Sequence, residues 1–159
     1  ILDPLFRFWF RFVYGKEDRY ERLGADAYDA VIEPELPDFV SHEFERLCRD
    51  ALPGLYPDET FLDIGRWWYN EHEVDVVGFT TDGTMVAGEC KFTNAPLDYG
   101  ALSSLEDHAA EIRWTPDGDE RDTEYALFTR NGATRSVQEA VSERDDVRLF
   151  ELGDITEHA

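Results

Sequence analysis

Apolar residues recur along the chain with two different spacings, and together the spacings predict an α/β fold. Helical spacing predicts helices over residues 5–14, 39–52, 99–114 and 134–142. Shorter runs rich in β-branched and aromatic residues predict strands at residues 61–68, 74–79, 85–92, 124–130 and 147–152. This order, a three-strand meander followed by alternating helices and strands, predicts an α/β sandwich with a mixed sheet.

Residues that cap or break helices indicate where these elements start and end. Asp3-Pro4 is typical of a helix start, and Asp38 and Asp98 are candidate N-caps. Pro53-Gly54 predicts the end of the helix that Asp38 starts.

The polar segments divide the chain. Residues 15–37 predict one short helix near Tyr20 followed by a loop, and residues 115–122 predict a charged loop. We therefore expect a helical extension over residues 1–37 and one α/β domain over residues 38–159.

The central meander carries three charged residues inside apolar runs. Asp82-Gly83 joins the second and third strands, which is a strong hairpin signal. Glu89 and Lys91 then share one face of the sheet, about 7 Å apart, and Asp75 lies on the paired strand. Two carboxylates and an ammonium that converge in this way can hold Mg²⁺ or Mn²⁺. Lys91 would orient or deprotonate a water and neutralise charge at a phosphate. The alternative is a cross-strand salt bridge of Lys91 with Asp75 or Glu89.

Other side chains near this hairpin allow more than one interpretation. Glu43 and Glu45 flank the apolar stripe of their helix on opposite sides, so periodicity cannot choose between them as an auxiliary acid. Glu73 is a third candidate, because it shares a face with Asp75. Trp67-Trp68 predicts one indole on each face of the sheet, for core packing or for base stacking.

Several segments together resemble the C-terminal domain of archaeal DEXX-box ATPases, catalogued as domain of unknown function 234. The matching segments are residues 1–14, 44–45, 65–68, 73–77, 88–92 and 125–128. That family is similar to PD-(D/E)xK nucleases, so the resemblance implies a restriction-endonuclease-like three-layer sandwich acting on DNA. It implies that Asp75 and Glu89 are metal ligands, that Lys91 is the catalytic lysine and that Glu45 is the acid on the helix. No proline precedes Asp75 to complete the literal motif.

The composition is strongly acidic. The 159 residues contain 36 acidic and 15 basic residues, with a net charge of −21, and Lys16 and Lys91 are the two lysines. This bias resembles that of halophilic proteins. It opposes nucleic-acid binding, because phosphate recognition normally uses a basic surface, unless local arginines and a metal suffice.

Cysteines and hydropathy bear on the cellular context. Cys48 and Cys90 lie in apolar segments and are expected to be buried free thiols rather than a disulfide framework. His72 has no second histidine or cysteine at ligand spacing, so a zinc site is not expected. No apolar run reaches transmembrane length and no signal peptide precedes the domain, so we expect a cytoplasmic protein.

Two functions are compatible with the sequence. One is metal-dependent hydrolysis of DNA by Asp75, Glu89, Lys91 and Glu45. The other is a catalytically inactive interaction module of an ATPase that has kept the nuclease fold. DNA versus RNA and the oligomeric state stay open.

The net charge of −21 leads to a first prediction about stability. Because the Debye length falls to about 3 Å in 1 M salt, multimolar KCl should screen the self-repulsion of the folded chain. We expect Tm to rise steeply from dilute buffer to multimolar KCl, and more than with an uncharged co-solute. A flat Tm would contradict the halophile interpretation.

Overall fold

The computed structural model describes residues 3–114 and 121–159, so the predicted charged loop lies largely outside the described residues. The chain forms two compact units, Ile1–Glu43 and Phe44–Ala159. The boundary falls inside the helix α3, Leu36–Leu55.

The N-terminal unit is helical throughout most of its length. Its helices are α1 at Pro4–Phe12, α2 at Glu17–Leu23, a 3₁₀ turn at Gly24–Asp26 and a π-helical turn at Tyr28–Ile32. Asp3 caps α1 as predicted, because its Oδ1 accepts the N–H of Leu5 at 2.8 Å. The loop predicted after Tyr20 is wrong: the chain stays helical there and buries Ala27 and Val31.

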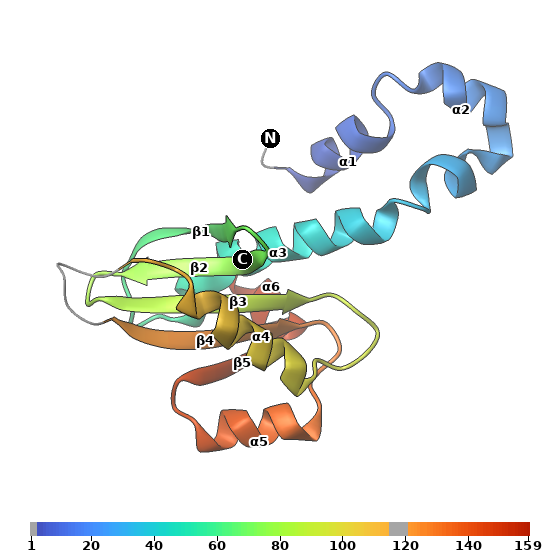
Figure 1. Ribbon diagram of the computed structural model, residues 1–159. Helices are drawn as coiled ribbons and strands as arrows, with labels where there is room; N and C mark the ends of the chain where they lie inside the picture. The colour runs from blue at the N-terminus through green and yellow to red at the C-terminus, as the bar shows by residue number, and fades with distance from the viewer. Residues whose placement is uncertain (1–2, 115–120) are drawn as a thin grey trace. The chain divides into compact units, whose positions relative to one another are not determined.

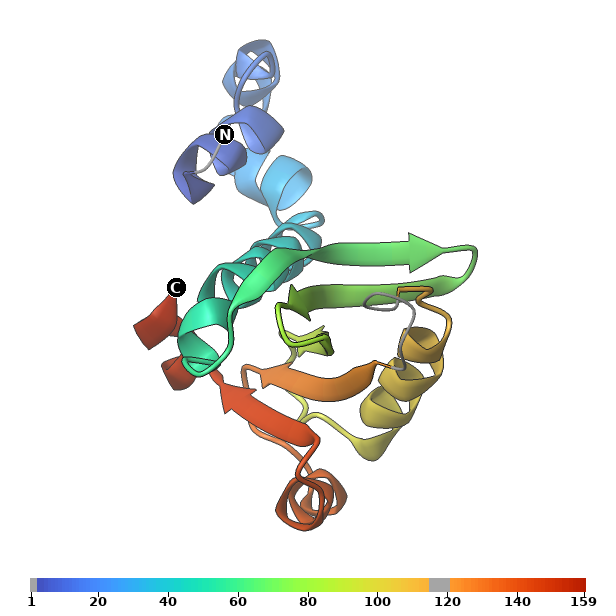
Figure 2. The same cartoon turned by 90° about the vertical axis from the view of Figure 1, so that its left-hand side faces the viewer.

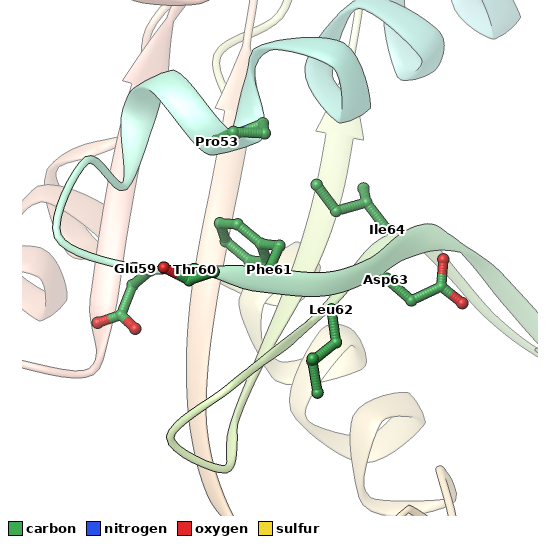
Figure 3. A pocket seen from close by; sticks show the side chains of 7 residues that line it. All are labelled: Pro53, Glu59, Thr60, Phe61, Leu62, Asp63 and Ile64. Atoms are coloured by element: carbon green, nitrogen blue, oxygen red, sulfur yellow. The ribbon is translucent and has the colours of Figure 1, made fainter.

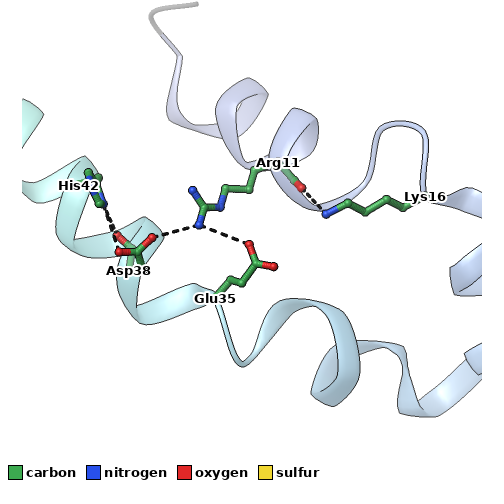
Figure 4. A network of polar contacts seen from close by, with 5 residues as sticks. All are labelled: Arg11, Lys16, Glu35, Asp38 and His42. Atoms are coloured by element: carbon green, nitrogen blue, oxygen red, sulfur yellow. Dashed lines mark hydrogen bonds and ion pairs between the residues drawn. The ribbon is translucent and has the colours of Figure 1, made fainter.

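Ion pairs fix the polar side of this unit (Figure 4). The Arg11 guanidinium lies 3.3 Å from Glu35 and 3.0 Å from Asp38. Lys16 donates to the Arg11 carbonyl at 2.7 Å. One of the two lysines thus has a local structural role.

Helix α3 differs from the prediction at both ends. It begins before Asp38 and continues through Pro53 and Gly54 to Leu55. Pro53 removes one backbone donor, but Leu52, Leu55 and Tyr56 are buried around it. Burial of these side chains outweighs the missing hydrogen bond, and apolar periodicity alone did not reveal that.

A five-stranded sheet forms the centre of the C-terminal unit, in the order β1-β2-β3-β4-β5. The strands are β1 at Phe61–Tyr69, β2 at His72–Thr80, β3 at Thr84–Lys91, β4 at Asp122–Thr129 and β5 at Val147–Glu151. The first three strands pair antiparallel, and β3, β4 and β5 pair parallel. The predicted mixed sheet and its central hairpin are confirmed.

Helices cover both faces of this sheet. Figures 1 and 2 show α4, Tyr99–Ala110, on the face opposite α3. One core cluster joins α4 and α5, Arg135–Glu143, to the sheet, and the other joins α3 and α6, Leu152–His158. Asp98 caps α4 as predicted. Helix α6 was not predicted; Glu151 and Asp154 form a capping box that starts it.

Edge strand β1 carries a bulge near its start (Figure 3). The register shifts between Phe61 and Asp63, so Phe61 and Ile64 both point toward α3 while Leu62 points away. These residues line a pocket of about 500 Å³ together with Pro53 and Glu59. Bulges of this kind bend an edge strand and hinder its pairing with other chains.

Close packing at Gly88 gives a second prediction. A Cβ at Gly88 would lie 2.8 Å from Phe128 and 2.9 Å from Val76, whereas a Cβ at Gly65 meets nothing within 4 Å. We expect Gly88→Ala to lower the free energy of unfolding by about 1–3 kcal/mol through overpacking. Gly65→Ala is the matched strand control and should change it by less than about 0.5 kcal/mol. Equal denaturation midpoints for the two variants would contradict this packing.

Candidate active site

Strands β2 and β3 separate where Asp75 lies. Their pairing ends at Val76 and Gly88, and on the other side β2 bulges so that Asp75 and Val76 oppose a single residue of β1. Beyond that point the Asp75 carboxylate, not a backbone carbonyl, accepts the N–H of Cys90 at 2.9 Å. The carboxylate therefore stands in the gap between two diverging strands, where bulges often re-aim a functional side chain.

Glu89 and Lys91 lie at the end of β3 on one face, as the alternation predicted. The Lys91 ammonium is 2.5 Å from Glu89 Oε1, with the Glu89 side chain 15% and the Lys91 side chain 42% exposed. Cys90 points to the opposite face and packs in the cluster that contains Cys48. Both thiols are free, as expected.

The three charges perturb one another. Burial raises the pKa of Asp75, against the lowering effects of the Cys90 N–H and the Lys91 charge. Burial and the negative charge of Asp75 raise the pKa of Glu89. Burial of Lys91 favours its neutral form, but the hydrogen bond and charge of Glu89 outweigh it and raise the pKa of Lys91. The structure thus brings the three residues into one electrostatic cluster with Lys91 protonated at neutral pH.

The auxiliary acids lie in different surroundings. Glu43 accepts two hydrogen bonds from Arg7 Nε, at 2.8 and 2.9 Å, within the N-terminal unit. Glu45 lies 3.7 Å from Arg49, one helical turn further on α3, and Arg49 donates to the Asp75 carbonyl at 2.5 Å. Glu73 acts on Asp75 through its charge, which raises the pKa of Asp75. Glu45 as a ligand stays a prediction.

Three further residues around the site were not identified from the sequence. Arg49 was detectable as the i+4 partner of Glu45 on a helix. His108 on α4 donates from Nδ1 to the Glu73 carbonyl, 2.8 Å away. Arg130 follows β4, its N–H donates to the Lys91 carbonyl at 3.1 Å, and its guanidinium lies 4.8 Å from the centre of the Phe92 ring. His108 and Arg130 arrive by tertiary contacts, for which local sequence carries no signal.

The donor set at Asp75 and Glu89 fits a hard divalent cation. Mg²⁺ usually takes one or two carboxylates and keeps several waters. Two part-buried carboxylates whose charges repel would gain from a cation between them. Within the described ranges, no three His, Cys, Asp or Glu side chains are grouped so as to hold a metal together. Any site would therefore rest on two carboxylates and water.

Comparison with known proteins identifies the family of the chain. The family described as Archaea bacterial proteins of unknown function, DUF234, matches residues 9–115, which is more than half of the chain. The chain belongs to this family, which confirms the assignment to domain of unknown function 234 made from the motifs. No curated protein matches the chain.

Two solved structures are similar to the chain. A MspJI restriction endonuclease in complex with a 27-mer oligonucleotide aligns over 83% of this chain and 31% of its own, with 16% identity and a TM-score of 0.54. A repair endonuclease from Pyrococcus abyssi aligns over 64% of this chain and 43% of its own, with 15% identity and a TM-score of 0.43. The chain thus spans less than half of either structure. The fold is restriction-endonuclease-like.

No helix in the described part of the chain is long and apolar enough to cross a membrane.

Repulsion between Asp75 and Glu89 gives a third prediction, for the protein without metal. Asp75→Asn removes one charge but keeps an oxygen that can accept the Cys90 N–H. We expect Tm in EDTA to rise, at about 2–4 °C for each 1 kcal/mol regained. Because any lost negative charge helps a chain of net charge −21, the control is Asp63→Asn on exposed β1. The prediction fails if Asp63→Asn raises Tm as much as Asp75→Asn.

Proposed function

We propose that this chain is a metal-dependent nuclease domain that hydrolyses phosphodiester bonds of DNA. The observation that carries the proposal is the cluster of Asp75, Glu89 and Lys91 at the point where β2 and β3 diverge. Glu89 and Lys91 are ion-paired, and each of them interacts electrostatically with Asp75. The restriction-endonuclease-like fold supports the same class.

Each residue has a distinct role in this proposal. Asp75 and Glu89 hold Mg²⁺ or Mn²⁺, with Glu45 as an auxiliary acid reached through Arg49. The bound ion supplies Lewis-acid polarisation of the phosphate and lowers the pKa of water. Lys91, held by Glu89, orients the attacking water and donates to the phosphoryl oxygen on which negative charge develops. Its raised pKa favours this cationic role over proton abstraction.

The acidic composition opposes nucleic-acid binding, but cations lie close to the candidate site. Arg130 and Lys91 lie at the adjoining ends of the parallel strands β4 and β3, and Arg130 has no carboxylate within ion-pair distance among the described residues. A phosphate approaching the site would therefore meet positive charge close by. Coulomb interactions at this range act even when salt screens the rest of the surface.

The alternative explanation for Lys91 and Glu89 is that they form a purely structural salt bridge. Exposed ion pairs contribute little, yet here a second carboxylate, Asp75, is part-buried beside the pair and raises the pKa of Glu89. A sheet selected for stability alone would gain from a neutral acceptor such as asparagine at this position, which would keep the hydrogen bond from the Cys90 N–H without the second negative charge. The retained repulsion favours a ligand role for Asp75.

An interaction module of an ATPase is the second candidate. Its support lies in the N-terminal unit, where α1 exposes 73% of Leu5 and 57% of Phe6. Leu5, Phe6, Phe8, Trp9 and Val13 line an apolar groove of about 400 Å³. An exposed face of this kind is typical of a protein-binding surface. In this alternative the acid cluster is inherited and inactive.

Cleavage is the fourth prediction and decides between the two candidates. We expect slow nicking of plasmid DNA in Mg²⁺ or Mn²⁺ at high salt, abolished by EDTA and by Asp75→Ala or Glu89→Ala, which remove a charged ligand. Lys91→Ala should lower the rate about a hundredfold, or roughly 3 kcal/mol, because charge at the phosphate is then unmet.

The control for contaminating nuclease is Asp63→Ala, purified identically, which removes an exposed acid from β1 and should cut like wild type. A metal-induced rise in Tm, present in wild type and absent in Asp75→Ala, would report binding separately from cleavage. Equal cutting by wild type and Asp75→Ala, or no cutting by either, would favour the interaction module.

A further inference from the structure

The edge strand next to the candidate site carries an exposed tryptophan paired with an arginine. Trp68 on β1 is 63% exposed, and the Arg66 guanidinium carbon lies 4.9 Å from the centre of its ring. The indole is thus held by a cation–π contact. Core packing does not account for it, because Trp67 is the indole that packs into the core cluster.

Strand pairing places this pair beside Asp75. Trp68 is opposite Glu73 in the β1–β2 register, and Trp67 is opposite Val74. The register shift between Gly65 and Trp67 sets Arg66 opposite the bulge of β2 that contains Asp75. Neighbouring strands are about 4.8 Å apart. A polymer with a phosphate at Asp75 would therefore have its next units within reach of β1.

A pocket of about 510 Å³ lies at the same end of β1. It is lined by Trp67, Trp68, Tyr69, Glu111 and Arg113, and Tyr69 is 59% exposed. The volume and the aromatic walls suit a flat heterocycle. Glu111 can accept a hydrogen bond from an exocyclic amino group, and Arg113 can donate to a phosphate. We name Arg66, Trp68, Tyr69 and Arg113 the Trp68 surface.

The charges of the Trp68 surface select a kind of ligand. The chain has 36 acidic residues for 15 basic ones, yet within the described ranges neither Arg66 nor Arg113 has a carboxylate at ion-pair distance. Unpaired guanidinium groups beside exposed aromatic rings complement a ligand that is flat and anionic. A nucleotide has both properties, whereas an apolar protein surface would leave both arginines without a counter-charge.

We propose that the Trp68 surface binds an unpaired nucleotide of the substrate strand, with its base stacked on the exposed indole of Trp68 and its phosphate on Arg66 or Arg113. Inside a duplex both faces of a base are covered by the neighbouring base pairs, so the substrate class is DNA with a single-stranded segment next to the cut. This inference rests on the proposed nuclease function and gives its substrate.

Equilibrium binding in EDTA tests the inference without requiring cleavage. Fluorescence anisotropy compares a labelled single-stranded oligonucleotide with an abasic strand of the same length, at several KCl concentrations because phosphate binding depends on salt. Wild type should bind the strand with bases roughly tenfold or more tightly than the abasic strand, because loss of one stacked base typically lowers affinity by about that factor. Trp68→Ala should lose that preference and Trp68→Phe should keep most of it.

Leu62→Ala is the matched control, because Leu62 is 66% exposed on the same strand and away from the Trp68 surface. It should bind as wild type does, and thermal unfolding checks that each variant is folded. Equal affinity of wild type for the two strands would overturn the inference. So would a preference that Trp68→Ala leaves intact, the result expected if this surface binds a protein instead.

The cleavage assay separates the inference from the proposed function. Base-dependent binding without cutting would leave the Trp68 surface standing and remove the nuclease. Cutting of duplex DNA without base-dependent binding would support the nuclease function and remove the Trp68 surface as a nucleotide-binding site.

Discussion

The arrangement of the candidate site depends on one hydrogen bond, from the Cys90 N–H to the Asp75 carboxylate at 2.9 Å. The β2–β3 ladder ends at Val76 and Gly88, one residue from Asp75 and two residues from Cys90. The Asp75 side chain therefore takes over as acceptor for a backbone N–H that would otherwise need another partner. The strands can then diverge without leaving the Cys90 N–H unsatisfied. The same bond fixes the carboxylate beside Glu89, whose neighbour in the chain is Cys90. Asp75 therefore has a structural role, as the acceptor at the end of the ladder, and a chemical one, because its charge lies beside that of Glu89.

These two carboxylates create a local excess of negative charge balanced from several elements. Lys91 pairs with Glu89, while Arg49 reaches across from α3 to the Asp75 carbonyl and to Glu45. Burial still raises the pKa of both Asp75 and Glu89 despite these cations, so the charged forms of both carboxylates remain disfavoured in the site. Buried like charges usually cost stability, and sites that keep such a cost are more often functional than structural. The remaining imbalance is of the sign that a divalent cation would relieve.

Local sequence predicted the parts of the structure that local physics determines. Asp82-Gly83 between β-branched runs identified the hairpin, and strand alternation put Glu89 and Lys91 on one face. The Pro53 signal failed because burial of Leu52 and Leu55 holds α3 together past it. Helix α6 was not predicted because its seven residues are too few to show an apolar periodicity. Arg130 and His108 were not identified for another reason. Tertiary structure brings them to the site at the end of β4 and on α4, and no local sequence pattern links their positions to those of Asp75 and Glu89.

The contrast between net charge and local charge bears on how such a chain meets a polyanion. A net charge of −21 repels nucleic acid at long range in dilute salt, but this field is screened beyond about 3 Å in molar salt. Short-range contacts then determine whether the chain binds a polyanion. Arg66 and Arg130 each stack on an aromatic ring, Trp68 and Phe92 respectively, which fixes the guanidinium without using a carboxylate as partner. Aromatic stacking is not weakened by salt as ion pairs are, since it involves no release of counterions. A surface that combines few cations with exposed rings therefore keeps its affinity for nucleotides under conditions where a basic surface would lose it.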